Sequence, residues 1–547
     1  MTETIEHPLI GVLVGKAEDG IIQFLGVRYA SLTDRLAEPE LLSHYDGEKI
    51  DATKKGRQVI SPPNGCGIEY GFIQQSLQPS SFEISDLDSL HLNITVPSDA
   101  HDLPVLVFVH GGGFALGSNA WPQYDHSRLV KLSVETGLPI LAVGINYRLG
   151  VPGFLTSKEL RAAGYKPNNG IRDQRIALKW VKQYIQGFGG DPNNVTLMGQ
   201  SAGAVASFLH LQSEEPLFGQ LIAMSGTSLA LPPISPEVAE TAYALCLKTL
   251  GIQELSETNR VRDIVHGPSP KLWTNIPAYI PLRPVIDNDI VFRGPTHEDF
   301  AMGPFQVEAV LPGAKWCRRV LIGDCQSDAS IFSYSLMKRQ TGIAKAFHNS
   351  LSKYLSNSPE AVCALEQAYG INSNTTDEVA LRNILDAASD IRFYAPVLAI
   401  GNNWPGETYV YHFNEPNPWE GPWKGTASHC LDFAYLFQNF NEYLTPTQQE
   451  LAKQFAEHVI CFIHGKAPFP SRQSARSGAM VYGQPRNGAA FVQSVSPNDF
   501  GRREKLFQLA QGVGLDKLNA AVGHFLDGMP PLIDQDCELL HHVIQGD

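Results

Sequence analysis

The sequence lacks any apolar run long enough to cross a membrane and any extended run of Lys or Arg. A membrane-spanning helix needs about 20 apolar residues, so we expect no membrane span. Lys and Arg number 42 against 56 Asp and Glu, which gives a formal net charge of −14. Without a basic stripe to neutralise phosphates, nucleic acid is not an expected partner.

Cysteine is scarce and scattered: the chain has eight, with no CxxC spacing and no Cys/His cluster of the kind that binds zinc. We therefore expect free thiols, no metal and no other cofactor. The first residues place Glu3 and Glu6 where an export signal would carry positive charge. The sequence predicts a cytoplasmic protein, since thiols stay reduced there, and it makes no prediction of oligomeric state.

Internal repeats and linkers long enough to separate domains are also missing. Short apolar runs bounded by Gly, Pro or polar residues alternate with helical patterns, as at residues 171–186 and after Thr445-Pro446. Such alternation predicts an α/β fold with a large, mostly parallel sheet covered by helices on both faces. The predicted strands are 105–109, 140–145, 195–198, 221–224, 319–322 and 409–413.

Length alone would divide 547 residues into three or four domains of roughly 150 residues. Two segments, at about 230–300 and 330–400, are longer than simple crossovers and rich in helical pattern. We interpret them as helical insertions over the active site of one domain that spans residues 1–547. The polar stretch 466–478 is predicted to be an exposed loop with solvated basic side chains.

The central motif is residues 195–203 (VTLMGQSAG), a strand followed by GxSxG and then by small residues that open a helix. Glycine at 199 and 203 permits a sharp turn that lifts the Ser201 hydroxyl above the carboxyl edge of the sheet. A nucleophilic serine also needs donors for the oxyanion that forms at the attacked carbonyl. Residues 110–114 (HGGGF) follow another strand, so the backbone N–H groups of Gly112, Gly113 and Ala202 are the predicted donors.

Longer motifs accompany these two: residues 24–30 (FLGVRYA), 146–154 (NYRLGVPGF) and 188–203 (FGGDPNNVTLMGQSAG), with Asn169-Gly and Asp173-Gln174 between them. In these motifs the chain resembles the type-B carboxylesterases, the cholinesterase and carboxylesterase/lipase family of the α/β-hydrolase fold, and especially its fungal intracellular members. These motifs run in family order over nearly the whole chain. The resemblance implies a Ser, acid, His triad in that chain order.

The acid implied by the resemblance is Asp328, at the end of residues 321–328 (LIGDCQSD), where many relatives carry Glu. Asp324 is the nearest rival. The histidine is His429, within residues 425–437 (GTASHCLDFAYLF). We expect His429 to act as general base toward Ser201 and then as general acid, with Asp328 fixing its tautomer.

Three further residues take structural roles by resemblance. Arg148 and Asp173 match positions that form an internal ion pair, and Ser225 matches a hydroxyl kept close to the triad. The substrate pocket is less sharply indicated, because aromatic residues belong to cores more often than to pockets. The candidate lining residues are Phe114, Gln200, Ala278, Tyr279, Ile280, Trp419 and Trp423.

Several positions differ from the family's motifs, and these differences exclude some of the activities found in the family. Ser89 stands where secreted relatives carry the cysteine that would pair with Cys66, so the first family disulfide cannot form. No tryptophan lies between Cys66 and Ser89 to bind choline by a cation–π contact, and neutral Gln200 replaces a common Glu. Cholinesterase activity is not expected.

The predicted function is hydrolysis of small carboxylic esters through an acyl-enzyme at Ser201. An acyltransferase, a thioesterase or a lactonase of biosynthesis or detoxification could use the same triad. A different class of protein, a binding member of the fold without activity, is disfavoured because every triad and oxyanion position is filled. The natural substrate does not follow from the sequence.

Overall fold

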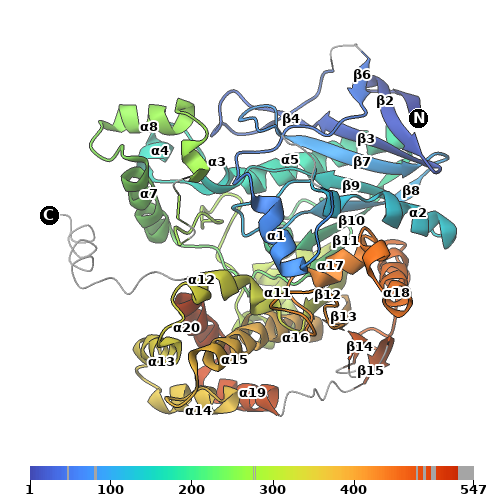
Figure 1. The fold of residues 1–547 in the computed structure, drawn as a ribbon. Coiled ribbons are helices and arrows are strands. Elements are labelled where there is room, and N and C mark those ends of the chain that lie inside the picture. Colours follow the sequence, from blue (N-terminus) through green and yellow to red (C-terminus); the bar gives the residue numbers. More distant parts are fainter. Residues whose placement is uncertain are drawn as a thin grey trace. The chain divides into compact units, whose positions relative to one another are not determined.

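The computed structural model describes residues 1–45, 49–78, 83–274, 276–277, 279–475, 478–484, 488–493 and 501–527. The chain divides into two compact units (Figure 1). Unit 1 comprises Met1–Ile276, Ile280–Asp328 and Phe393–Ser496, and unit 2 comprises Pro277–Tyr279, Ala329–Arg392 and Pro497–Asp547. Each unit is described by itself.

Unit 1 contains a 13-stranded sheet in the order β1-β2-β3-β7-β9-β8-β10-β11-β12-β13-β14-β15, with β6 beside β2. The run from β9 to β14 is parallel, and the strands at both ends pair antiparallel, except that β6 is parallel to β2. All six predicted strands are confirmed as β8 to β13. The strands are β1 Thr2–His7, β2 Gly11–Glu18, β3 Ile21–Arg28, β4 Ala30–Ser31, β5 Glu40–Leu41, β6 Ile50–Ala52, β7 His91–Pro97, β8 Leu103–Val109, β9 Leu141–Ile145, β10 Gly190–Gln200, β11 Gln220–Met224, β12 Arg319–Cys325, β13 Glu407–Asn414, β14 Ala479–Gly483 and β15 Ala489–Val492.

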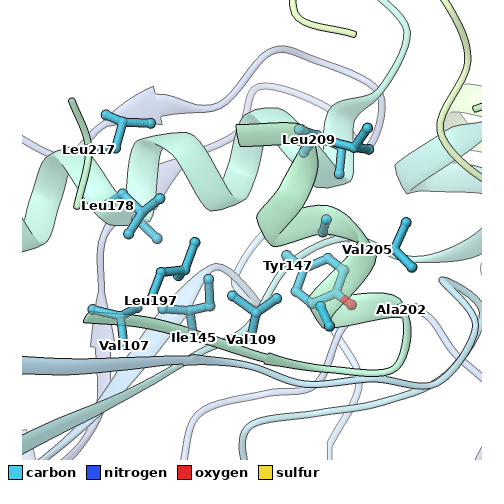
Figure 2. Packing of buried hydrophobic residues seen from close by; sticks show 14 of the residues in the cluster. Val107, Val109, Ile145, Tyr147, Leu178, Leu197, Ala202, Val205, Leu209 and Leu217 are labelled. Atoms are coloured by element: carbon cyan, nitrogen blue, oxygen red, sulfur yellow. The ribbon is translucent and has the colours of Figure 1, made fainter. Parts of the chain in front are cut away.

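Both faces of the central strands are buried. In β8, Val107 and Val109 belong to one hydrophobic cluster, whereas Leu106 and Phe108 belong to another, because successive side chains point to opposite faces. Helices α5 and α6 cover the first face, as Figure 2 shows for Leu178 and the α6 side chains, and α2 and α18 supply the second cluster. Apolar runs without alternation are therefore the expected pattern for these strands.

The two helical segments predicted by position in unit 1 are confirmed. The segment predicted at 171–186 is α5, and the segment after Thr445-Pro446 is α18. Thr445 caps α18 through a reciprocal capping box with Gln448, a feature worth about 1 kcal/mol. The helices are α1 Gly65–Ile73, α2 Ser127–Glu135, α3 Gly150–Phe154, α4 Lys158–Ala162, α5 Asn169–Tyr184, α6 Ala202–His210, α7 Pro236–Leu250, α8 Glu257–His266, α9 Lys271–Thr274, α10 His297–Ala301, α11 Pro304–Val310, α16 Ala395–Asn403, α17 Leu431–Leu436 and α18 Pro446–Ile463.

Unit 2 is helical in its described part. Asp390 is fully buried there and accepts hydrogen bonds from Arg502 Nε at 2.8 Å and Arg503 Nε at 2.7 Å, so its charge is paired on both carboxylate oxygens. The helices are α12 Ser333–Met337, α13 Ile343–Tyr354, α14 Pro359–Tyr369, α15 Asp377–Ser389, α19 Arg502–Val513 and α20 Leu515–Asp527.

Short 3₁₀ helices also occur along the described chain: η1 Pro122–Tyr124, η2 Ile185–Phe188, η3 Pro312–Lys315, η4 Asp328–Phe332 and η6 Asn441–Tyr443. One short π-helix is η5 Asp390–Tyr394.

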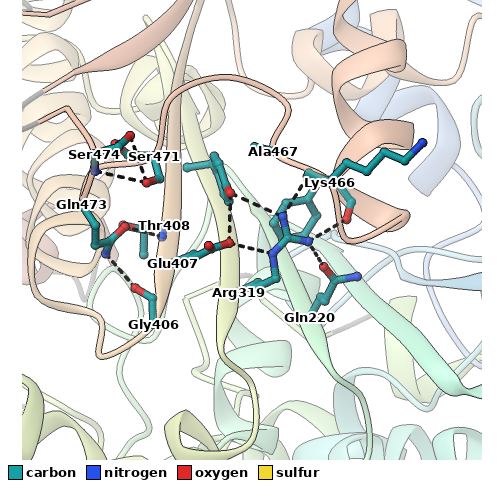
Figure 3. Close-up of polar contacts among 12 residues, drawn as sticks. Gln220, Arg319, Gly406, Glu407, Thr408, Lys466, Ala467, Ser471, Gln473 and Ser474 are labelled. Carbon is teal, nitrogen blue, oxygen red and sulfur yellow. Dashed lines mark hydrogen bonds and ion pairs between the residues drawn. The ribbon is translucent and has the colours of Figure 1, made fainter.

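Arg319, the first residue of β12, ties together the starts of neighbouring strands (Figure 3). It bonds to Gln220 of β11, to Glu407 of β13 at 3.0 Å and to the Lys466 carbonyl at 2.8 Å.

The prediction that residues 466–478 form an exposed loop with solvated basic side chains is in part wrong. Arg472 is only 7% exposed, and burial lowers the pKa of its guanidinium; Arg476 lies outside the described residues.

Candidate active site

Ser201 occupies the turn between β10 and α6. Its backbone has φ 54° and ψ −122°, outside the regions that side-chain-bearing residues normally occupy. Two hydrogen bonds hold this conformation: Ser201 N–H donates to Met224 O at 2.9 Å, and Val205 N–H donates to Ser201 O at 3.0 Å. Strain of this kind persists only where the surrounding structure enforces it, and it is typical of catalytic turns.

Close backbone contacts explain the glycines around Ser201. A Cβ on Gly199 would lie 2.3 Å from Gly203 O, and a Cβ on Gly203 would lie 2.1 Å from Val109 O. A Cβ on Gly226, after β11, would lie 2.3 Å from Ser201 O. The turn therefore packs against β8 and the end of β11 at distances that only glycine allows.

Asp328 and His429 lie side by side. His429 Nδ1 is 2.8 Å from Asp328 Oδ1, and both side chains are buried. The backbone N–H of Cys325 donates to the other oxygen, Asp328 Oδ2, at 2.8 Å. Burial raises the pKa of Asp328, while the hydrogen bond and charge of His429 lower it.

The rival carboxylate, Asp324, has a different partner. It bonds to Nδ1 of His412, which is directly opposite it in the β12–β13 pairing. Both side chains of this second pair are buried. The structure thus brings Asp328, and not Asp324, to the imidazole of His429.

The hydrogen bonds of His429 indicate its tautomer. If Nδ1–H donates to Asp328, then Nε2 carries the lone pair. Gln200 Nε2 lies 3.3 Å from His429 Nε2, the geometry of an amide that donates to that lone pair. Gln200 is fully buried and also donates to Cys430 Sγ at 3.5 Å. The residue before Ser201 is therefore in contact with the imidazole. Phe393 packs against the same ring at a centroid distance of 5.8 Å.

The predicted oxyanion loop follows β8. Gly112 has φ 103° and Gly113 has φ 62°, and a Cβ on Gly112 would lie 2.0 Å from Leu116 O. The Gly112 carbonyl accepts the N–H groups of Ala115 and Leu116, both at 3.0 Å. Ala202 is the first residue of α6, directly after Ser201.

The predicted pocket residues lie in different surroundings. Phe114 is fully buried and packs on Phe154 at 4.9 Å, and Ile280 is a core residue of unit 1. Tyr279 belongs to unit 2 and is 42% exposed. Trp423 and Trp419 are buried, and Ala278 lies outside the described residues.

The predicted internal ion pair is confirmed. Arg148 Nη2 lies 2.7 Å from Asp173 Oδ1, and Arg148 Nε lies 2.9 Å from Asp173 Oδ2 in a bidentate contact with both side chains buried. Ser225 Oγ is 3.7 Å from Cys325 Sγ. Ser225 is thus adjacent to the end of β12, three residues before Asp328.

Sequence reasoning missed two buried carboxyl groups near His429. Asp432, three residues after the histidine, accepts a hydrogen bond from Tyr411 at 2.8 Å, and burial with the charge of Asp328 raises its pKa to about 6. Its spacing from His429 could have indicated it. Glu69 of α1 is the second, and no local pattern distinguishes it.

Cys66 is a free thiol, as are the other cysteines of the described part. Within the described residues no cluster of three or more His, Cys, Asp or Glu side chains has the placement of a metal site. No helix in that part is long and apolar enough to cross a membrane.

The sheet order and the strand-turn-helix around Ser201 define an α/β-hydrolase. Solved esterase structures share the fold: a PNB esterase has a TM-score of 0.70 at 23% identity, and juvenile hormone esterase from Manduca sexta has 0.72 at 22%. Each alignment covers 93% of this chain and 100% of the other.

A sequence model of the Carboxylesterase family matches residues 3–482, so the chain belongs to that family. Para-nitrobenzyl esterase of Bacillus subtilis is 34% identical over 260 residues, 46% of this chain and 49% of that protein. Lipase 3 of Yarrowia lipolytica is 27% identical over 82% of this chain and 86% of its own length. Acylcarnitine hydrolase of Mus musculus is 28% identical over 80% and 77%. The family and these relatives support a carboxylic ester hydrolase.

Proposed function

We propose that the protein is a serine carboxylesterase with Ser201, His429 and Asp328 as its catalytic triad. The observation that carries the proposal is the 2.8 Å contact between His429 Nδ1 and Asp328 Oδ1, in the same unit as the strained turn at Ser201. This contact leaves Nε2 as the basic nitrogen, the state that a general base requires.

In the proposed reaction Ser201 Oγ attacks the ester carbonyl while His429 Nε2 takes the hydroxyl proton. The oxyanion accepts hydrogen bonds from the N–H groups of Gly112, Gly113 and Ala202, each typically worth about 3 kcal/mol of transition-state stabilisation. The tetrahedral intermediate expels the alcohol, which receives the proton from His429. Water then attacks the acyl-enzyme by the same route and releases the acid.

Labelling of Ser201 tests the mechanism. A fluorophosphonate should form one covalent adduct on Ser201, because only an activated serine attacks the phosphorus. Mass spectrometry of peptic peptides would locate the adduct, and Ser201→Ala is the matched control. An unlabelled Ser201 in protein with native circular dichroism would contradict the proposed nucleophile.

Acyl transfer is the second candidate, since the same triad would pass the acyl group to an alcohol or amine in place of water. Thioesterase and lactonase activities remain further alternatives for the same reason. A library of p-nitrophenyl esters and thioesters, graded by acyl length and assayed with and without added alcohols, separates these reactions. No turnover of any substrate would favour a non-enzymatic binding protein of this fold.

The proposed substrates are small carboxylic esters, and the residues that line the pocket determine which of these esters is preferred. The relatives carry the names esterase, lipase and acylcarnitine hydrolase, which differ in the ester that each cleaves. We propose that Phe114, Gln200, Ile280 and Trp423, all in unit 1, shape the acyl and alcohol sites. Substitution of a lining residue should change the preferred acyl length.

We also propose that residues 1–547 act as one catalytic domain with helical insertions at about 230–300 and 330–400, and that the protein works in the cytoplasm. Helices α7 to α10 and α12 to α15 lie in those two segments, which supports the first point. Free thiols support the second, although one relative is a secreted lipase of Gibberella zeae. Fractionation of the source cells would test the location.

A further inference from the structure

Glu69 is a buried carboxyl group that the triad mechanism does not use. It lies on α1, is 3% exposed, and accepts hydrogen bonds from Gln123 Nε2 at 2.9 Å and from the Tyr124 hydroxyl at 2.5 Å. A buried carboxylate is costly unless it is bonded or serves a nearby positive charge. These two neutral donors form hydrogen bonds with both carboxylate oxygens of Glu69, but they do not neutralise its negative charge.

The helix that carries Glu69 is bonded to the loop that carries His429. Ser428, the residue before the histidine, donates from Oγ to Phe72 O at 2.8 Å. Asn417 Nδ2 donates to Ile73 O at 3.0 Å, and Trp423 N–H donates to Gln74 Oε1 at 2.6 Å. One turn of helix separates these bonds from Glu69, so they hold the helix that carries Glu69 against the histidine loop, and the bonds from Gln123 and Tyr124 fix its carboxyl group.

We propose that Glu69 is a positioning residue for His429, and that its carboxylate supplies the negative charge that favours the protonated imidazole during acyl transfer. Gln200, which touches His429 Nε2, brings no charge of its own. Asp328 is committed to Nδ1. The inference rests on the proposed function, since it assigns Glu69 a part in the same triad.

Electrostatics support this placement. Burial raises the pKa of Glu69 to about 7, against the lowering effect of the bonds from Tyr124 and Gln123 and of the charge on His429. The titratable groups that face Glu69 are Cys66 and Tyr70 of its own helix, Tyr124, His429 and Cys430. Burial raises the pKa of each of these groups except His429, so they stay neutral, and the positive charge that acts on Glu69 is that of His429.

The test is the pH profile of ester hydrolysis by Glu69→Gln, which removes the charge and keeps the size. Loss of the negative charge should lower kcat by about tenfold, the equivalent of one pKa unit, with little change in KM. The acid limb of kcat/KM should move to lower pH by about one unit, because the imidazole gives up its proton more readily. The acid limb of the variant should also fit a single ionisation, because the carboxyl group of Glu69, whose pKa is about 7, has been removed.

Two further variants control the test. Glu415→Gln removes another carboxyl whose pKa burial raises, one bonded by Gln448, and it should leave the profile unchanged. Tyr124→Phe removes a hydrogen bond that lowers the pKa of Glu69. The ionisation that Glu69 contributes to the acid limb should therefore move to higher pH. Tyr124→Phe also keeps the question open to measurement if Glu69→Gln fails to fold.

The outcomes separate the two proposals. If the wild-type protein hydrolyses esters and labels at Ser201, but Glu69→Gln and Tyr124→Phe both keep the wild-type acid limb, then Glu69 has only a structural role. If the wild-type protein neither labels nor hydrolyses, the proposed function and the role of Glu69 both fail.

Discussion

At the scale of single residues, the environment of His429 is set by buried acids. Asp328 contacts its Nδ1, Asp324 is paired with His412, and Asp432 is bonded by Tyr411. Burial, together with repulsion from Asp328, raises the pKa of Asp432, and burial, together with the charge of Asp324, raises that of Asp328. Hydrogen bonding therefore decides which carboxylate serves the imidazole.

Replacing the two rival acids by amides should separate their roles. Under the proposed mechanism Asp328→Asn would hold His429 in the wrong tautomer, and a loss of roughly 10⁴-fold in kcat is expected, as for the same change in a serine protease triad. Asp324→Asn should cost less, since its partner is His412. Steady-state hydrolysis of p-nitrophenyl acetate measures both. A larger loss for Asp324→Asn would transfer the acid role to Asp324.

At the scale of elements, the β10–α6 turn joins a strand to a helix and leaves no room for a Cβ at the glycine positions around Ser201. Ser201 takes a positive φ, and Gly199, Gly203 and Gly226 surround it at distances that no Cβ could share. The small residues that open α6 thus serve close packing of the helix against β8. Packing of the hydrophobic core beneath the turn stabilises this strained geometry (Figure 2).

A methyl group at Gly203 should disrupt this turn. Gly203→Ala places Cβ 2.1 Å from Val109 O, and such overpacking typically costs about 1–3 kcal/mol. Gly67→Ala is the matched control: it lies within α1 with nothing within 4 Å of the added Cβ, so a gain of up to about 1 kcal/mol is expected. Urea unfolding followed by tryptophan fluorescence measures both. Equal stability for the two variants would contradict the packing argument.

At the scale of the whole molecule, stability comes from buried apolar clusters on both faces of the sheet, without covalent cross-links in the described part. The cysteines differ widely in exposure: Cys363 is exposed, Cys66 and Cys461 are partly buried, and Cys246, Cys317, Cys325 and Cys430 are buried.

Reductant should therefore leave the unfolding temperature unchanged, because there is no disulfide among these cysteines to break. Iodoacetamide should label Cys363 first in the native protein and the buried thiols only after unfolding. Calorimetry with and without dithiothreitol, and peptide mass spectrometry after timed labelling, make the measurements. A fall of several degrees with dithiothreitol would reveal a cross-link.

Much of the fold was predictable from local pattern. Buried parallel strands are continuous apolar runs, and Thr445-Pro446 is a helix start, because each pattern depends on neighbours within a few residues. Strands β1 to β7, β14 and β15 were not predicted. Pairs such as β2–β6 and β3–β7 join residues that lie far apart along the chain. The solvated state expected of Arg472 was wrong for the same reason, because its backbone N–H pairs with the distant Thr408 O and its side chain is buried.

The sequence by itself determined the family, the strand-turn-helix around Ser201 and the order of the triad candidates, since these are carried by motifs of contiguous residues. Only the tertiary structure decided that Asp328 contacts His429 while Asp324 contacts His412, that Gln200 reaches the imidazole, and that Glu69 is buried beside the histidine loop. These contacts join residues far apart along the chain, and burial and hydrogen bonding, not local spacing, select among carboxyl groups of equal chemistry.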